Sequence, residues 1–106
     1  MAASRLEQLK KMLSDNPDDA FLQYAMAKEL EKAGFTNEAI EALEFLIKSQ
    51  PDYVATYYQL VKLYVRDQQI DKALSILDIG LERASSLGKA HEAAELRALR
   101  DDLMDD

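Results

Sequence analysis

The sequence predicts an all-α protein, a short solenoid of about six antiparallel helices, and three observations support this. The 106 residues are rich in the strong helix formers Ala, Leu, Glu, Lys and Gln, with only three Gly and two Pro. The prolines, Pro17 and Pro51, lie 34 residues apart, and each is followed by aspartate. Apolar residues recur at helical spacing between them. We therefore expect helical repeats within a single domain over residues 1–106.

A shift of 34 residues aligns more than the prolines. Identical side chains coincide in four pairs: Tyr24 with Tyr58, Lys28 with Lys62, Ala39 with Ala73, and Leu43 with Leu77. Because the matches recur at helical spacing, they describe buried stripes. The expected segments are an N-terminal half repeat over 1–16, full repeats over 17–50 and 51–84, and a capping helix with an acidic tail over 85–106.

The half repeat is predicted to form a helix over residues 3–14. Its apolar stripe consists of Leu6, Leu9, Met12 and Leu13. In the first full repeat, Pro17 suits the first turn of a helix, and the carboxylates of Asp18 and Asp19 favour its positive end. This helix should run to about Ala33 and end at Gly34, which tolerates a positive φ.

Thr36 or Asn37 is predicted to cap the next helix, which should end before Pro51. Its apolar face is formed by Ala39, Ile40, Leu43, Leu46 and Ile47, and Phe35 and Phe45 are expected to pack similarly. The second repeat should follow the same plan, with helices over about 52–66 and 71–84 and a turn at 67–69. Gly80 lies in the middle of its second helix, which predicts a close approach of another helix.

The last helix is predicted over about residues 86–103. Its apolar positions are Ala90, Ala93, Ala94, Leu96, Leu99 and Leu103, and its other face is charged. A terminal helix with a polar outer face keeps a stack of repeats soluble. The acidic residues after it, Asp101, Asp102, Asp105 and Asp106, oppose the helix dipole, so we expect this end to fray.

The repeat length, the small or apolar positions Ala27/Val61 and Ala39/Ala73, and the turn prolines resemble the tetratricopeptide repeat (TPR) family, in particular its small stand-alone bacterial members. The resemblance implies a right-handed solenoid whose first helices line a concave groove. The sequence departs from the family where an early aromatic residue is Gln23 in one repeat and Tyr57 in the other. The small residue usual in the second helix is Leu46 and Gly80.

The resemblance implies a module that binds a peptide or protein partner in this groove. The predicted groove residues are Phe21, Tyr24, Lys28, Lys32, Tyr58, Gln59, Lys62 and Arg66. A repeated Tyr–Lys pair suits an acidic segment or a C-terminal carboxylate. Alternatively, the tyrosines are half-buried packing residues and the lysines only increase solubility. A chaperone-type clamp is not predicted, because its asparagines are missing.

Composition excludes several classes of function. The net charge of −7 disfavours nucleic acid, although the predicted groove is basic. The chain has no cysteine and no enzyme motif, and His91 alone makes a weak metal site, so neither catalysis nor a cofactor is predicted. Without an apolar run long enough for a membrane span or a signal peptide, a cytoplasmic location is expected.

Self-association into a homodimer is the alternative function, with the chain acting as a structural scaffold. Short stacks expose apolar end surfaces. The residues predicted to form such a contact are Leu6, Met12 and Leu13 at one end, or Leu96, Leu99, Leu103 and Met104 at the other.

Overall fold

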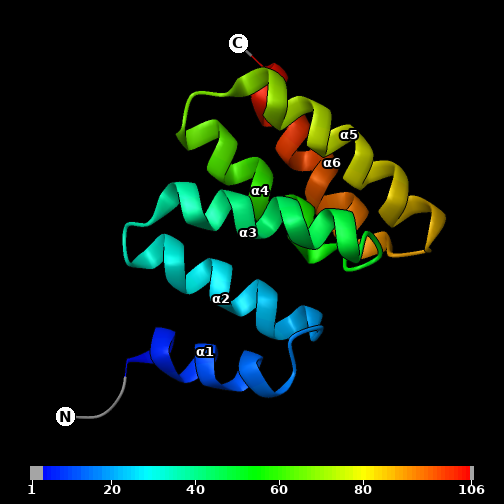
Figure 1. The fold of residues 1–106 in the computed structure, drawn as a ribbon. Helices are drawn as coiled ribbons and strands as arrows, with labels where there is room; N and C mark the ends of the chain where they lie inside the picture. The colour runs from blue at the N-terminus through cyan, green and yellow to red at the C-terminus, as the bar shows by residue number, and fades with distance from the viewer. Residues whose placement is uncertain (1–3, 106) are drawn as a thin grey trace. The chain divides into compact units, whose positions relative to one another are not determined.

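The computed structural model describes residues 4–105 and confirms the all-α prediction for them. These residues form six helices and no strand (Figure 1). The helices are α1 (Arg5–Asp15), α2 (Ala20–Lys32), α3 (Thr36–Ser49), α4 (Ala55–Arg66), α5 (Ile70–Ser86) and α6 (Ala90–Met104). None of them is long and apolar enough to cross a membrane.

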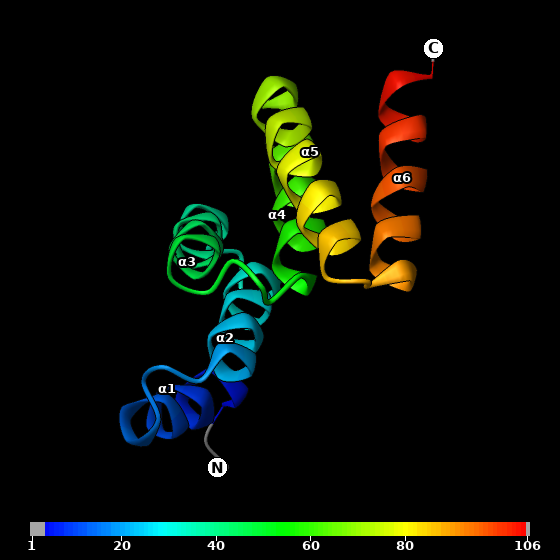
Figure 2. The same ribbon diagram turned by 90° about the vertical axis from the view of Figure 1, so that its right-hand side faces the viewer.

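The chain divides between Gln50 and Pro51 into two compact units. In the N-terminal unit, α2 packs against both α1 and α3, and the three helices follow one another as antiparallel neighbours (Figures 1 and 2). In the C-terminal unit, α5 packs against both α4 and α6. The boundary between the units coincides with the predicted boundary between the two full repeats.

Each unit has an apolar core at the predicted stripes. The buried side chains of the N-terminal unit include Leu9, Leu22, Ala27, Ala39, Ile40, Leu43 and Leu46. Those of the C-terminal unit include Tyr57, Leu60, Val61, Tyr64, Ala73, Leu77, Ala84, Ala93 and Leu96. The repeated Ala39/Ala73 and Leu43/Leu77 pairs are all buried, so they mark packing positions.

Some predicted core positions are wrong. Met12 and Phe35 are 44% and 48% exposed, and Phe45 is 61% exposed. Ala90 and Ala94 also face solvent. Phe35 lies in a turn, and Met12 lies on α1, a terminal helix that packs mainly against α2, so a smaller part of its surface is covered.

Three helices, α2, α4 and α5, end in the same turn. In each, a residue with positive φ follows the helix: Gly34 (90°), Gln68 (62°) and Gly88 (70°). The next N–H donates back across the turn, in the bonds Phe35 N to Leu30 O (2.9 Å), Gln69 N to Tyr64 O (2.8 Å) and Lys89 N to Ala84 O (2.8 Å). This is the Schellman motif, and Gly34 ends α2 as predicted.

Gln68 is the non-glycine residue in this set, which makes it a site for stabilisation. We expect Gln68→Gly to raise the free energy of unfolding by about 0.5–1 kcal/mol. The strain of a left-handed residue, about 1–2 kcal/mol, exceeds the entropy cost of glycine, about 0.4–1 kcal/mol. Urea unfolding measures this change. Gly34→Gln is the reciprocal variant and should destabilise the protein, since its Cβ meets nothing within 4 Å and only the backbone is tested.

The structure corrects the predicted helix starts. Asp19 is the N-cap of α2, where its Oδ1 accepts a hydrogen bond from the Leu22 N–H at 3.0 Å, and Pro17 lies in the preceding turn. Neither Thr36 nor Asn37 caps α3, because the helix begins at Thr36 directly after the Schellman turn. The residue at its N-cap position, Phe35, has no side-chain oxygen to offer.

The predicted boundary between the last two helices is also wrong. Helix α5 continues to Ser86, because the chain has no proline there to stop it. Helix α6 then begins at Ala90, after the turn at Gly88, instead of at Ser86. It persists to Met104, so Asp101 and Asp102 lie within the helix and do not belong to a frayed end. Asp106 lies outside the described residues.

Equivalent residues of the two repeats hold the proline turns. The Gln23 amide Nε2 donates to the Pro17 carbonyl at 2.7 Å, and the Tyr57 hydroxyl donates to the Pro51 carbonyl at 2.7 Å. Burial raises the pKa of the Tyr57 hydroxyl, an effect that the nearby Arg83 guanidinium reduces and the Asp52 carboxylate increases. The tether is therefore shared between repeats, although the side chains differ.

Tyr57 also explains Gly80. A Cβ built at Gly80 would lie 2.6 Å from the Cβ of Tyr57 and 2.7 Å from its Cγ, closer than real carbon atoms approach. The predicted close helix approach is thus confirmed between α4 and α5. The first repeat has the reverse combination, with the smaller Gln23 at the position of Tyr57 and the larger Leu46 at the position of Gly80.

Candidate functional site

Four predicted groove residues gather around one cavity of the N-terminal unit. This cavity, about 310 Å³ in volume, is lined by Arg5, Phe21, Tyr24, Ala25, Lys28, Glu29 and Lys32. We call these residues the α2 surface. Phe21 is 59% exposed, Tyr24 is half-buried, and Lys28 and Lys32 are exposed. The cavity thus combines aromatic rings with cations within reach of solvent.

On the α2 surface the tyrosine and lysine of the repeated pair contact each other. Lys28 Nζ lies over the Tyr24 ring, 5.5 Å from its centroid. The two residues are four apart on one helix, which places their side chains on the same face. A cation held over an aromatic ring keeps its outer N–H groups available to an anion. The pair therefore offers a flat apolar surface with a positive charge beside it.

Arg5 belongs to the α2 surface and was not among the predicted residues. It is the first residue of α1, and the antiparallel pairing of α1 with α2 brings it beside the end of α2. The predicted half repeat already implied this placement. Three cationic side chains therefore line the cavity with the carboxylate of Glu29, which lies 3.7 Å from Lys32 Nζ. Such an exposed ion pair is weak, so the cavity retains a net positive charge.

The other predicted residues lie on α4 in the C-terminal unit. We call Tyr58, Gln59, Lys62 and Arg66 the α4 surface. Tyr58 and Gln59 are half-buried, whereas Lys62 and Arg66 are exposed. Lys62 Nζ lies 5.4 Å from the centroid of the Tyr58 ring, which repeats the arrangement seen on α2. The spacing of four residues places Tyr58, Lys62 and Arg66 on one helix face.

Other candidate sites from the sequence are less well formed. The exposed His91 forms a contact of 3.4 Å from its Nε2 to Glu95 Oε1. Among the described residues, no group of three His, Asp or Glu side chains is placed to hold a metal ion. Of the residues proposed for self-association, Leu96 is buried in its own unit, whereas Met12 and Met104 are 44% and 68% exposed.

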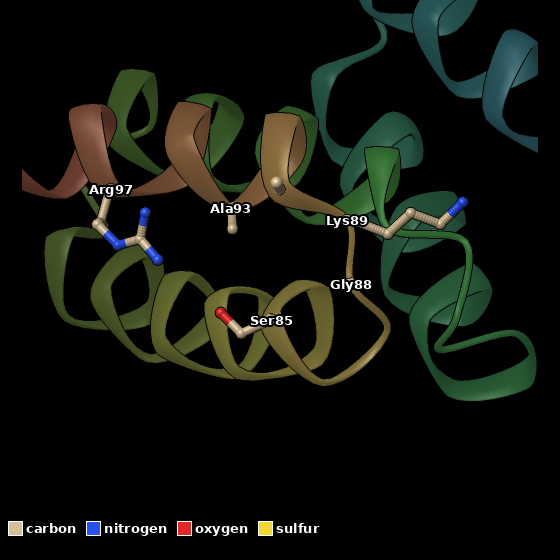
Figure 3. A pocket seen from close by; sticks show the side chains of 6 residues that line it. Ser85, Gly88, Lys89, Ala93 and Arg97 are labelled. Atoms are coloured by element: carbon tan, nitrogen blue, oxygen red, sulfur yellow. The ribbon is translucent and has the colours of Figure 1, made fainter.

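A cavity of about 270 Å³ also lies beside the turn between α5 and α6. It is lined by Ser85, Gly88, Lys89, Ala90, Ala93 and Arg97. Figure 3 shows the Arg97 side chain reaching from α6 toward α5, whereas Lys89 points away from the cavity. Its two cationic groups do not converge, so this cavity is a poorer anion site than the α2 surface.

Comparisons with known proteins agree with this architecture. A profile of the tetratricopeptide repeat family matches residues 30–99. The solution NMR structure of a tetratricopeptide repeat domain protein from Salinibacter ruber has a TM-score of 0.80 and is 35% identical, covering 83% of this chain and 89% of that one. Protein BPP2914 from Bordetella parapertussis is similar in fold, with a TM-score of 0.82 at 22% identity, covering 96% of this chain and 89% of that one.

A relative among human proteins extends the sequence match. Protein IFIT1 homolog B from Homo sapiens is 28% identical over 89 residues. The match covers 84% of this chain but 19% of that protein, so the chain spans a small part of the relative's length. The likeness therefore concerns the repeat region.

Proposed function

Because the chain belongs to the tetratricopeptide repeat family, whose fold mediates protein–protein interaction, we propose that it is a non-catalytic binding module for an acidic peptide. Its partner carries either an acidic segment or a C-terminal carboxylate. The α2 and α4 surfaces make the contacts. The observation that carries this proposal is the Tyr–Lys pair, which recurs in both repeats with nearly equal ring-to-cation distances of 5.5 and 5.4 Å.

The chemistry of the two surfaces matches such a ligand. Each tyrosine ring provides apolar contact, and each lysine ammonium can donate hydrogen bonds to a carboxylate. On α2, Arg5 adds a planar guanidinium that can bind a carboxylate through two parallel hydrogen bonds. The net charge of −7 repels acidic ligands at long range, so attraction must come from these local clusters of cations.

Charge reversal tests the assignment. We expect the double variant Lys28→Glu/Lys62→Glu to bind acidic peptides at least about tenfold more weakly, because each substitution replaces an attraction by a repulsion. The measurement is binding to an immobilised array of peptides with acidic segments or free C-terminal carboxylates. Lys10→Glu/Lys11→Glu, which places the same charge change on exposed positions of α1, is the matched control.

Two results would contradict the proposal. One is equal loss of binding in both double variants, which would indicate an effect of overall charge. The other is unchanged binding in Lys28→Glu/Lys62→Glu while its helical circular dichroism remains that of the parent protein. Light scattering addresses the alternative of a scaffold, since a monomeric binding module has a molar mass near 12.0 kDa and a homodimer twice that value.

A further inference from the structure

The N-terminal unit has a second cavity that the proposed function does not use. It has a volume of about 280 Å³ and is lined by Leu13, Pro17, Gln23, Met26, Ala42 and Phe45, from α1, α2, α3 and the turn before α2. None of these residues belongs to the α2 surface. The lining is apolar except for the Gln23 amide, and Phe45 at its edge is 61% exposed.

Gln23 gives this apolar cavity a specific polar requirement. Its Nε2 donates to the Pro17 carbonyl at 2.7 Å, and this bond fixes which way the amide points. The other atom of the amide, Oε1, is buried and has no hydrogen-bond partner among the described residues. A buried acceptor without a donor is unfavourable, so a ligand that brings an N–H or O–H group to this atom gains a hydrogen bond.

The second repeat indicates the shape of the missing group. There, Tyr57 holds the equivalent proline carbonyl with its hydroxyl, and its ring is buried. Gln23 keeps the tether but provides no ring. The first repeat therefore has the hydrogen bond of a tyrosine without its aromatic volume, and it has an apolar cavity lined by the same side chain.

We propose that this cavity binds an aromatic side chain with one hydrogen-bond donor, best matched by the indole of a tryptophan on a protein partner. An indole fills apolar space and donates through its N–H without adding an acceptor of its own. This chain contains no tryptophan, so the indole comes from a different protein and not from a second copy. The site lies apart from the Tyr–Lys pairs, so it can operate with or without them.

Charge at the edge of the cavity specifies the flanking residue of the partner. The exposed carboxylates of Glu38 and Glu41 precede Ala42 and Phe45 by one helical turn on the same face of α3. Lys10 lies three residues before Leu13 on α1, so the α1 side is the more positive one. A basic residue beside the tryptophan therefore complements the α3 side.

Small probes test the site directly. NMR titration with indole is expected to give saturable shifts at Leu13, Met26 and Ala42, and 1-methylindole, which lacks the donor, should bind at least about fivefold more weakly. In Gln23→Leu the two probes should bind equally, because the acceptor is gone. Lys28→Glu/Lys62→Glu should bind indole like the parent protein, which separates this site from the proposed peptide surfaces.

Matched peptides and variants complete the test. Acetyl-Lys-Trp-amide should bind more tightly than acetyl-Glu-Trp-amide. Phe45→Ala should weaken both, whereas Phe21→Ala, which removes a phenylalanine of similar exposure from the α2 surface, should not. The proposal is overturned if indole produces no saturable shifts at the cavity, if 1-methylindole binds the parent protein equally well, or if a water molecule remains bound at Gln23 Oε1 when indole is saturating.

Discussion

Gly80→Ala is expected to lower the free energy of unfolding by about 2 kcal/mol, as overpacking of a buried contact typically does. Alanine is normally the better residue inside a helix, by about 1 kcal/mol. Here its methyl group would lie 2.6 Å from Tyr57 Cβ, an atom fixed to the backbone of α4 that cannot move aside by a rotamer change. The helices must separate, and that loosens the contacts of a tyrosine that is 1% exposed.

A control on the same helix isolates the packing contribution. Ser75 is exposed on α5, so Ser75→Ala tests helix propensity without a clash and should leave stability equal or slightly higher. Chemical denaturation of the two variants beside the parent protein gives the comparison. If Gly80→Ala matched Ser75→Ala, the tight contact between α4 and α5 would not exist in solution.

The sequence predicted the helices better than their ends. Repetition at 34 residues located all six helices, because buried stripes leave a periodic trace. The caps were harder to predict, since they depend on the local path of the turn. Phe35 precedes α3 without a capping side chain because a Schellman turn leads straight into that helix, and Gln68 adopts a conformation that sequence patterns usually reserve for glycine.

Prediction of the candidate surfaces had a similar limit. Tyr24, Lys28, Tyr58 and Lys62 could be identified because the repeat duplicates them. Arg5 has no counterpart at the same spacing, and its place beside α2 follows only from the antiparallel pairing of α1. The cavity at Gln23 was also missed, because a departure from the repeat pattern shows which residue is smaller but not whether its neighbours fill the space.

The exchange of volumes between the repeats leads to the largest expected effect. Leu46→Gly should lower the free energy of unfolding by about 4 kcal/mol, because it removes a fully buried side chain and adds a glycine to a helix interior. Adding Gln23→Tyr reproduces the combination of Tyr57 with Gly80. Since the tyrosine ring can then occupy the space vacated by the leucine, we expect the double variant to recover about 1–3 kcal/mol.

The double-mutant cycle distinguishes complementary packing from independent substitutions. Gln23→Tyr alone must place its ring against an intact Leu46, so it should gain little or lose stability. A favourable coupling energy would mean that the two repeats are alternative solutions to one packing problem, a ring against glycine or an amide against leucine. Additive effects within about 0.5 kcal/mol would show that the two positions do not share a volume, and the difference at Gln23 would then need another cause. A favourable coupling would also mean that the tyrosine closes the cavity, so the double variant should lose indole binding in the same measurement that shows its recovered stability.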